Sequence, residues 1–133
     1  MADSMIGAAT PKVLVVEDDR GVTRMLGFAL REAGFQVSLA GSGGAALSAL
    51  EASPVDAVVL DLGLPDGQGS DVLHWLRQRR GSDGGGPVWV VMSALDRREA
   101  ARRYGPVDGH FLAKPFDPWE LARILNELLG RGS

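Results

Sequence analysis

Apolar runs of strand length alternate five times with segments of helical period along this chain. The expected strands cover residues 12–16, 35–40, 57–60, 88–92 and 109–113. Three of them consist almost entirely of Val, Leu and Met, as is typical of parallel strands covered on both faces. Strands that alternate with helices predict a parallel sheet with right-handed crossovers. We therefore expect a flavodoxin-like, doubly wound α/β domain.

The helical segments show the apolar spacing and the end signals of helices. They are expected at residues 22–33, 44–52, 70–79, 96–104 and from 117 onwards. Gly34 stands where a left-handed residue would end the first helix. Asp117, Pro118 and Glu120 fit the N-cap, N1 and N3 positions of the last one. The fourth helix is mostly polar, so we expect it to be weakly anchored and able to move.

Composition limits the class of protein. A length of 133 residues fits one domain, and 45% hydrophobic with 23% charged residues is typical of a soluble globular protein. The formal net charge of -3 gives no sign of direct nucleic-acid binding by this domain. The absence of cysteine excludes a disulfide framework, a thiol nucleophile and a cysteine-ligated zinc site.

The sequence shows neither a membrane-spanning pattern nor a signal-peptide pattern. No apolar run is long enough to span a bilayer, and the first ten residues lack the basic and apolar regions of a signal peptide. We expect a cytoplasmic protein that makes no membrane contact. Residues 1–11 are expected to form a disordered leader, 12–129 the domain and 130–133 a C-terminal tail.

Reactive side chains follow four of the five expected strands. In an open α/β sheet, ligands bind beyond the carboxyl ends of the strands. The residues expected at that edge are, in chain order, Glu17, Asp18, Asp19, Asp61, Ser93 and Lys114. Lys114 is one of only two lysines, the other being Lys12. Carboxylates, a hydroxyl and an ammonium group are therefore expected to meet at one edge of the sheet.

This combination of groups suits phosphoryl chemistry. Clustered carboxylates stay ionised together only if a cation lies among them. Oxygen ligands without His or Cys favour Mg²⁺ over a transition metal. Lys114 and Ser93 can contact the oxygens of a phosphoryl group, one as a charge and one as a hydrogen-bond donor. Asp61 would then be the nucleophile, with the metal offsetting charge in the transition state.

Four motifs in order carry a family resemblance. They are VLVVEDD at 13–19, VVLDLGLPDGQG at 58–69, VVMSA at 90–94 and FLAKPF at 111–116. With these motifs the chain resembles the response-regulator receiver (CheY-like) family over roughly residues 12–129. The resemblance implies a five-stranded parallel sheet in the order 2-1-3-4-5 with five helices.

The resemblance also implies a metal site and an acceptor. Asp61 would be the phosphoacceptor. Mg²⁺ would be held by Glu17, Asp18, Asp61 and the backbone carbonyl of Gly63. Glu17 stands where the family more often has Asp, and a register shifted by one residue would make Asp18 and Asp19 the pair instead. The strand that ends at Val16 favours Glu17 and Asp18.

Three further residues take roles by the same resemblance. Lys114 would pair with the phosphoryl group, and its bond to Pro115 would be cis. Ser93 would fill the Ser/Thr switch position, and Phe111 the aromatic switch position. The segment 102–108 departs most from the family pattern and contains Pro106.

The expected function is that of a phosphoacceptor receiver domain of a two-component system. Its donor would be a histidine kinase or a histidine phosphotransfer protein. It would be no enzyme beyond catalysing its own phosphorylation and dephosphorylation. Output would pass through a partner protein or through an effector domain outside this chain, and a phosphorylation-dependent dimer is also compatible with the sequence.

Three alternative functions fit the sequence less well. A degenerate receiver, acting as a phosphorylation-independent interaction module, typically lacks the acceptor or the lysine, and both are present. A haloacid-dehalogenase-type phosphohydrolase would need a second Asp at the position of Gly63. A flavin-binding module would need a Ser/Thr-rich loop after the first strand, where this chain has carboxylates.

Overall fold

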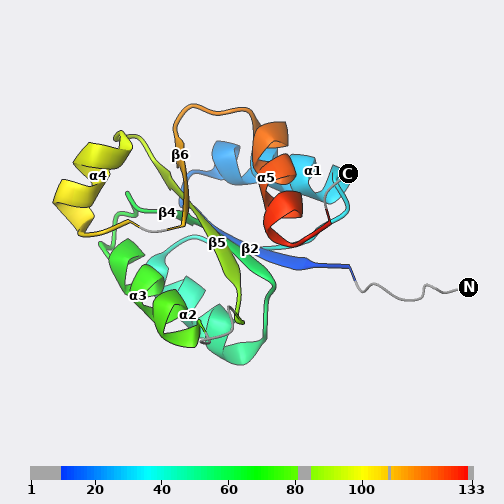
Figure 1. Ribbon diagram of the computed structural model, residues 1–133, viewed down its shortest axis with the longest axis horizontal. Coiled ribbons are helices and arrows are strands. Elements are labelled where there is room, and N and C mark those ends of the chain that lie inside the picture. Colours follow the sequence, from blue (N-terminus) through cyan, green and yellow to red (C-terminus); the bar gives the residue numbers. More distant parts are fainter. Residues whose placement is uncertain (1–9, 81–84, 108, 132–133) are drawn as a thin grey trace, which may run out of the picture.

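Five parallel strands form one sheet in the computed structural model, which describes residues 10–80, 85–107 and 109–131 (Figure 1). The strands are β2 (Lys12–Val16), β3 (Gln36–Ala40), β4 (Ala57–Asp61), β5 (Val88–Ser93) and β6 (His110–Ala113). Their spatial order is β3-β2-β4-β5-β6. Counted along the chain this is 2-1-3-4-5, so the expected doubly wound fold is confirmed.

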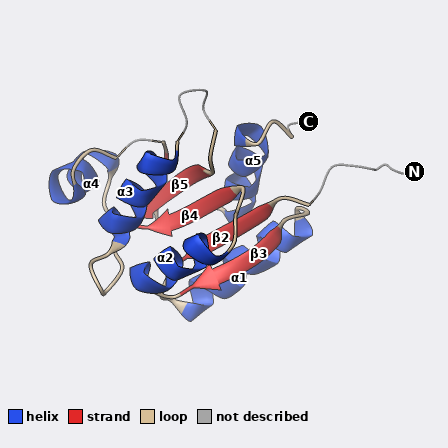
Figure 2. Ribbon diagram, turned by 90° about the horizontal axis from the view of Figure 1, so that it is seen from below, coloured by secondary structure: helices blue, strands red, loops and turns tan. Residues whose placement is uncertain are grey.

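Five helices connect and follow the strands. They are α1 (Arg20–Glu32), α2 (Gly43–Ala52), α3 (Gly69–Arg79), α4 (Arg97–Tyr104) and α5 (Pro118–Leu128). Figure 2 shows α2 and α3 on one face of the sheet and α1 on the other, and Figure 1 shows α1 beside α5. In the described parts of the chain, no helix is long and apolar enough to cross a membrane.

The sheet separates two apolar cores. Alternate residues of each strand point to opposite faces. Val13 and Val15 of β2 therefore pack in the layer under α1 and α5. Leu14 and Val16 pack in the layer under α2 and α3. All five residues of the central strand β4 are buried, as the continuous apolar run predicted.

The helix ends follow the sequence signals. The Asp19 side chain caps α1 by accepting a hydrogen bond from the Val22 amide at 3.0 Å. Gly34 follows this helix with φ +96°, so the expected left-handed position is confirmed. Asp117 caps α5 through the Trp119 amide at 2.9 Å, and Pro118 begins that helix.

The fourth helix is as weakly anchored as the sequence predicted. Within α4 only Ala100 is buried. The segment that follows is nevertheless held by two arginine side chains. Arg77 of α3 donates a hydrogen bond to the carbonyl of Pro106. Arg97 donates to the carbonyls of Val107 at 3.3 Å and Gly109 at 2.9 Å. Arg97 is exposed and Arg77 half-buried, so these contacts lie at the surface of the domain.

The expected chain ends are only partly described. Residues 1–9 of the expected leader and 132–133 of the expected tail lie outside the described residues, as do 81–84 and 108. The domain limits given by the sequence therefore stay a prediction. Within the described part, β2 begins at Lys12 and α5 ends at Leu128.

We predict that Gly43→Ala lowers the free energy of unfolding by about 1–3 kcal/mol, the usual cost of overpacking. A Cβ at Gly43 would lie 2.4 Å from the Cβ of Gln68 and 2.9 Å from its carbonyl, so the start of α2 would have to move away from α3. Chemical denaturation measures the change. Gly41→Ala is the matched control, because no atom lies within 4 Å of a Cβ there. Equal stability of the two variants would contradict the prediction.

Candidate functional site

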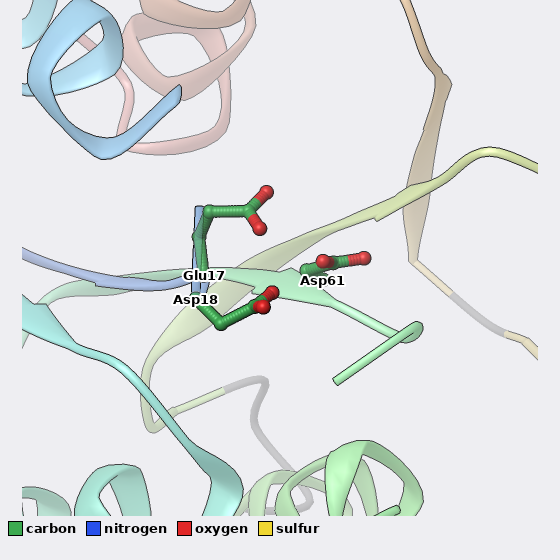
Figure 3. Close-up of side chains that lie close together, drawn as sticks. All are labelled: Glu17, Asp18 and Asp61. Atoms are coloured by element: carbon green, nitrogen blue, oxygen red, sulfur yellow. The ribbon is translucent and has the colours of Figure 1, made fainter. Parts of the chain in front are cut away.

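The carboxyl ends of four strands meet at one edge of the sheet. Val16 pairs with Leu60, so Glu17 and Asp61 follow on neighbouring strands. Ser93 ends β5, and Lys114 follows β6, where its amide donates a hydrogen bond to the Ser93 carbonyl at 2.8 Å. Figure 3 shows the side chains of Glu17, Asp18 and Asp61 close together. The expected convergence of these residues is therefore present in the structure.

Lys114 joins two buried carboxylates. Its Nζ lies 2.7 Å from Glu17 Oε1 and 3.3 Å from Asp61 Oδ2. Glu17 is only 2% exposed and Asp61 5%. An isolated charge at such depth would be costly, and a hydrogen-bonded partner of opposite sign offsets that cost. The Lys114–Pro115 peptide bond is cis, as the family resemblance implied.

Backbone amides hold the second oxygen of each buried carboxylate. The Asp19 amide donates to Glu17 Oε2 at 3.2 Å. The Gly63 amide donates to Asp61 Oδ1 at 3.0 Å. Each carboxylate thus has one oxygen on Lys114 and the other on the main chain two residues further along. This arrangement fixes the orientation of both carboxylates.

Burial and neighbouring charges act on the pKa values of this cluster. Burial raises the pKa of Glu17, and the charge of Asp61 adds to this, while the hydrogen bond from Lys114 opposes it without cancelling it. Burial acts to lower the pKa of Lys114, but the carboxylates of Glu17 and Asp61 outweigh it, so that pKa is raised. Lys114 therefore stays charged, whereas its positive charge does not fully compensate the burial of the ionised Glu17 carboxylate.

The carboxylates form a potential metal site. Glu17, Asp18 and Asp61 offer oxygen atoms that all lie within 4.8 Å of one another. Lys114 contacts two of these three carboxylates and supplies one positive charge, so the cluster keeps an excess of negative charge. Such an all-oxygen set fits a hard divalent cation. Asp19 instead caps α1 with its side chain, which favours the pair Glu17 and Asp18 over the shifted pair.

Gly63 contacts the carboxylate cluster with its main chain. A Cβ at this position would be 3.5 Å from Asp61 Oδ1, so the residue borders the Asp61 carboxylate. The amide contacts Asp61, whereas the carbonyl oxygen stays a predicted metal ligand.

Of the two expected switch residues, Ser93 ends β5 at this edge, whereas Phe111 lies two residues before the end of β6. Ser93 is buried, and its Oγ accepts a hydrogen bond from the Leu95 amide at 3.0 Å. Phe111 is half-buried on β6, and the guanidinium carbon of Arg97 lies 5.8 Å from its ring centre. Sequence reasoning missed Arg97, because four arginines on a polar helix are typical of a solvated face.

Asp66 links the loop after β4 to α2. Its Oδ2 accepts hydrogen bonds from the amides of Gly43 at 3.0 Å and Gly44 at 3.3 Å. Its Oδ1 accepts from the Gln68 amide at 3.2 Å. The turn at 65–69 thus positions the loop that begins at Asp61. Sequence reasoning identified the turn but missed this contact with α2, which no local signal marks.

Comparisons with known proteins bear on this geometry. The family model described as "Response regulator receiver domain" matches residues 13–126. The chain is 38% identical over 121 residues to the probable transcriptional regulatory protein TcrX of Mycobacterium tuberculosis, covering 90% of this chain and 50% of that protein. It is 41% identical over 128 residues to the transcriptional regulatory protein PrrA of Mycobacterium leprae, covering 94% and 52%.

A third curated relative is the DNA-binding response regulator MtrA of Mycobacterium leprae, 33% identical over 120 residues, with 90% of this chain and 52% of that protein covered. The chain thus spans about half the length of these three relatives.

Solved structures of receiver domains have the same fold. The CheY-like receiver domain from Methylobacillus flagellatus has a TM-score of 0.75 and 28% identity, covering 90% of this chain and 99% of that one. The receiver domain of the Francisella response regulator 1452 has a TM-score of 0.74 and 30% identity, covering 92% and 98%. Together with the family match, these likenesses show that the chain belongs to the response regulator receiver domain family of two-component signalling.

Proposed function

We propose that this chain is an active receiver that accepts a phosphoryl group on Asp61 in a Mg²⁺-dependent reaction. The observation that carries the proposal is the shared contact of Lys114 with two buried carboxylates. A carboxylate held by a backbone amide on one oxygen and by an ammonium group on the other is fixed for attack. The donor is a histidine kinase or a histidine phosphotransfer protein.

The chemistry follows from the placement of these groups. A carboxylate oxygen of Asp61 attacks phosphorus, and the new O–P bond forms as the P–N bond of the donor phosphohistidine breaks. The histidine nitrogen keeps the electron pair of that bond. Lys114 Nζ, next to Asp61 Oδ2, pairs with an oxygen of the arriving phosphoryl group. Hydrolysis of the acyl phosphate by water later restores the carboxylate, and the domain catalyses no other reaction.

The carboxylate cluster supports the Mg²⁺ requirement. Glu17, Asp18 and Asp61 would hold the ion, with the carbonyl of Gly63 as a further ligand. The ion would neutralise charge on the transferring phosphoryl group. The carboxylate cluster fits Mg²⁺ because its donors are all oxygen atoms and because its negative charge exceeds the one positive charge of Lys114.

The alternative of a phosphorylation-independent interaction module is less favoured. Such a module does not need two buried carboxylates held on one lysine, because these cost desolvation energy without helping a surface contact. Output passes through a partner protein or an effector domain outside this chain, as the names of the transcriptional and DNA-binding relatives suggest. We place this reaction in the cytoplasm, together with the phosphoryl donor.

We predict that incubation with Mg²⁺ and acetyl phosphate adds one phosphoryl group to the protein, measured by intact mass. Asp61→Asn should abolish the gain, because the amide is no nucleophile, and EDTA should prevent it. Asp71→Asn, the same change on the exposed face of α3, is a matched control that should keep the gain. A gain that persists in Asp61→Asn would contradict the assigned acceptor. No gain in the unaltered protein, together with no binding of beryllofluoride, would favour the interaction module.

We predict that Glu17→Gln weakens Mg²⁺ binding by about tenfold or more, because it removes one of three charges close to the ion. Calorimetric titration with MgCl₂ measures the affinity. Glu32→Gln, on the exposed end of α1, is the matched control and should leave the affinity unchanged. An equal affinity of Glu17→Gln and the unaltered protein would place the cation elsewhere.

A further inference from the structure

The edge strand β3 borders a groove that the phosphoryl chemistry does not use. β3 pairs with β2 on one side and ends the sheet on the other (Figure 2). The groove has a volume of ≈ 540 Å³ and lies between this strand and α1. It is lined by Leu39 of β3 and by residues of α1 that include Phe28.

The main chain of β3 offers free hydrogen-bonding groups at this edge. The Gln36 amide donates to the carbonyl of Pro11, and the Ala40 carbonyl accepts from the Glu17 amide. These residues direct their main-chain groups towards β2. In a parallel strand, alternate residues point to opposite sides. The amides and carbonyls of Val37 and Leu39 therefore point away from β2, and the sheet supplies no strand on that side in the described parts of the chain.

Apolar side chains lie exposed beside this free edge. Phe28 is 62% exposed and Leu39 50%. Both line the groove, so they form one apolar strip next to the free amides. An unpaired strand edge with exposed apolar groups is a template for adding a strand, and natural sheets usually protect it with charges, Pro or a bulge. β3 itself carries no charged residue and no Pro.

The rim of the groove is strongly basic. Arg20, Arg24 and Arg31 line it, with Glu32 as the one acid. The spacing of 4, 4 and 3 residues through Phe28 places the three arginines on the same stripe of α1. All three are exposed, and no salt bridge to another described residue satisfies them. The groove thus combines a free strand edge, an apolar strip and an excess of positive charge.

We propose that the β3 edge binds an extended acidic segment of a partner protein. Its main chain pairs with Val37 and Leu39, its apolar side chains cover Phe28 and Leu39, and its carboxylates contact the arginine rim. A second copy of this chain fits less well, because pairing two β3 edges would bring two arginine rims together. This surface would connect the receiver to a partner independently of the phosphoryl group on Asp61.

The test uses a short fluorescein-labelled peptide in which Glu alternates with Val and Leu, and a matched peptide with Lys in place of Glu. Fluorescence anisotropy with the full chain should show saturable binding of the Glu peptide alone. Arg24→Glu and Phe28→Ser should each weaken binding by about tenfold, because one reverses a rim charge and the other removes the apolar floor. Arg98→Glu, the same charge change on the exposed helix α4, should leave the affinity unchanged.

Amide hydrogen exchange locates the contact. The Glu peptide should slow exchange at Val37 and Leu39. Equal binding of both peptides, no binding, or protection elsewhere would overturn the proposal. Slow exchange of these two amides in the absence of peptide would also overturn the proposal. If that protection increased with protein concentration, the edge would bind a second copy of the chain. If deletion of residues 1–9 removed the protection, the edge would bind the chain's own N-terminal segment. Acetyl phosphate labelling of each variant separates this result from the proposed function, because Asp61 should react in all of them.

Discussion

Two buried carboxylates from different strands depend on one ammonium group. Lys114 Nζ contacts Glu17 and Asp61 at once, and no other cationic side chain contacts them in the described parts of the chain. Removing two charges from water costs several kcal/mol per ion unless hydrogen bonds and an opposite charge compensate. The main-chain amides of Asp19 and Gly63 provide the remaining compensation. The geometry of the candidate site follows from this compensation.

The sheet register makes that contact available. β2, β4 and β6 end at the same edge, although Glu17 and Lys114 are 97 residues apart in sequence. The central strands β4 and β5 are apolar up to their last residues, Asp61 and Ser93, because both of their faces are packed against helices. Polar groups therefore collect where the strands end. The same packing that stabilises the fold also concentrates the carboxylates that a phosphoryl transfer site needs.

Local patterns in the sequence predicted most of this arrangement. Apolar periodicity gave the strands and helices to within a few residues, because both depend on local burial. Glu17, Asp18, Asp61, Ser93 and Lys114 were placed by one rule, the position just after a strand. Contacts between distant segments were not predictable. Arg77 reaches Pro106 across 29 residues and Asp66 reaches Gly43 across 23, and neither residue carries a local signal for its partner.

In the proposed mechanism, Lys114 and a divalent cation share the same carboxylates. Calorimetric titration with MgCl₂ of the unaltered protein and Lys114→Met tests it most directly. Lys12→Met is the matched control, since Lys12 is exposed at the other end of β2. Removal of the Lys114 charge should tighten Mg²⁺ binding severalfold, because the ion no longer competes with an ammonium group for Glu17 and Asp61. Unchanged or weaker binding in Lys114→Met, or an equal change in Lys12→Met, would contradict the account.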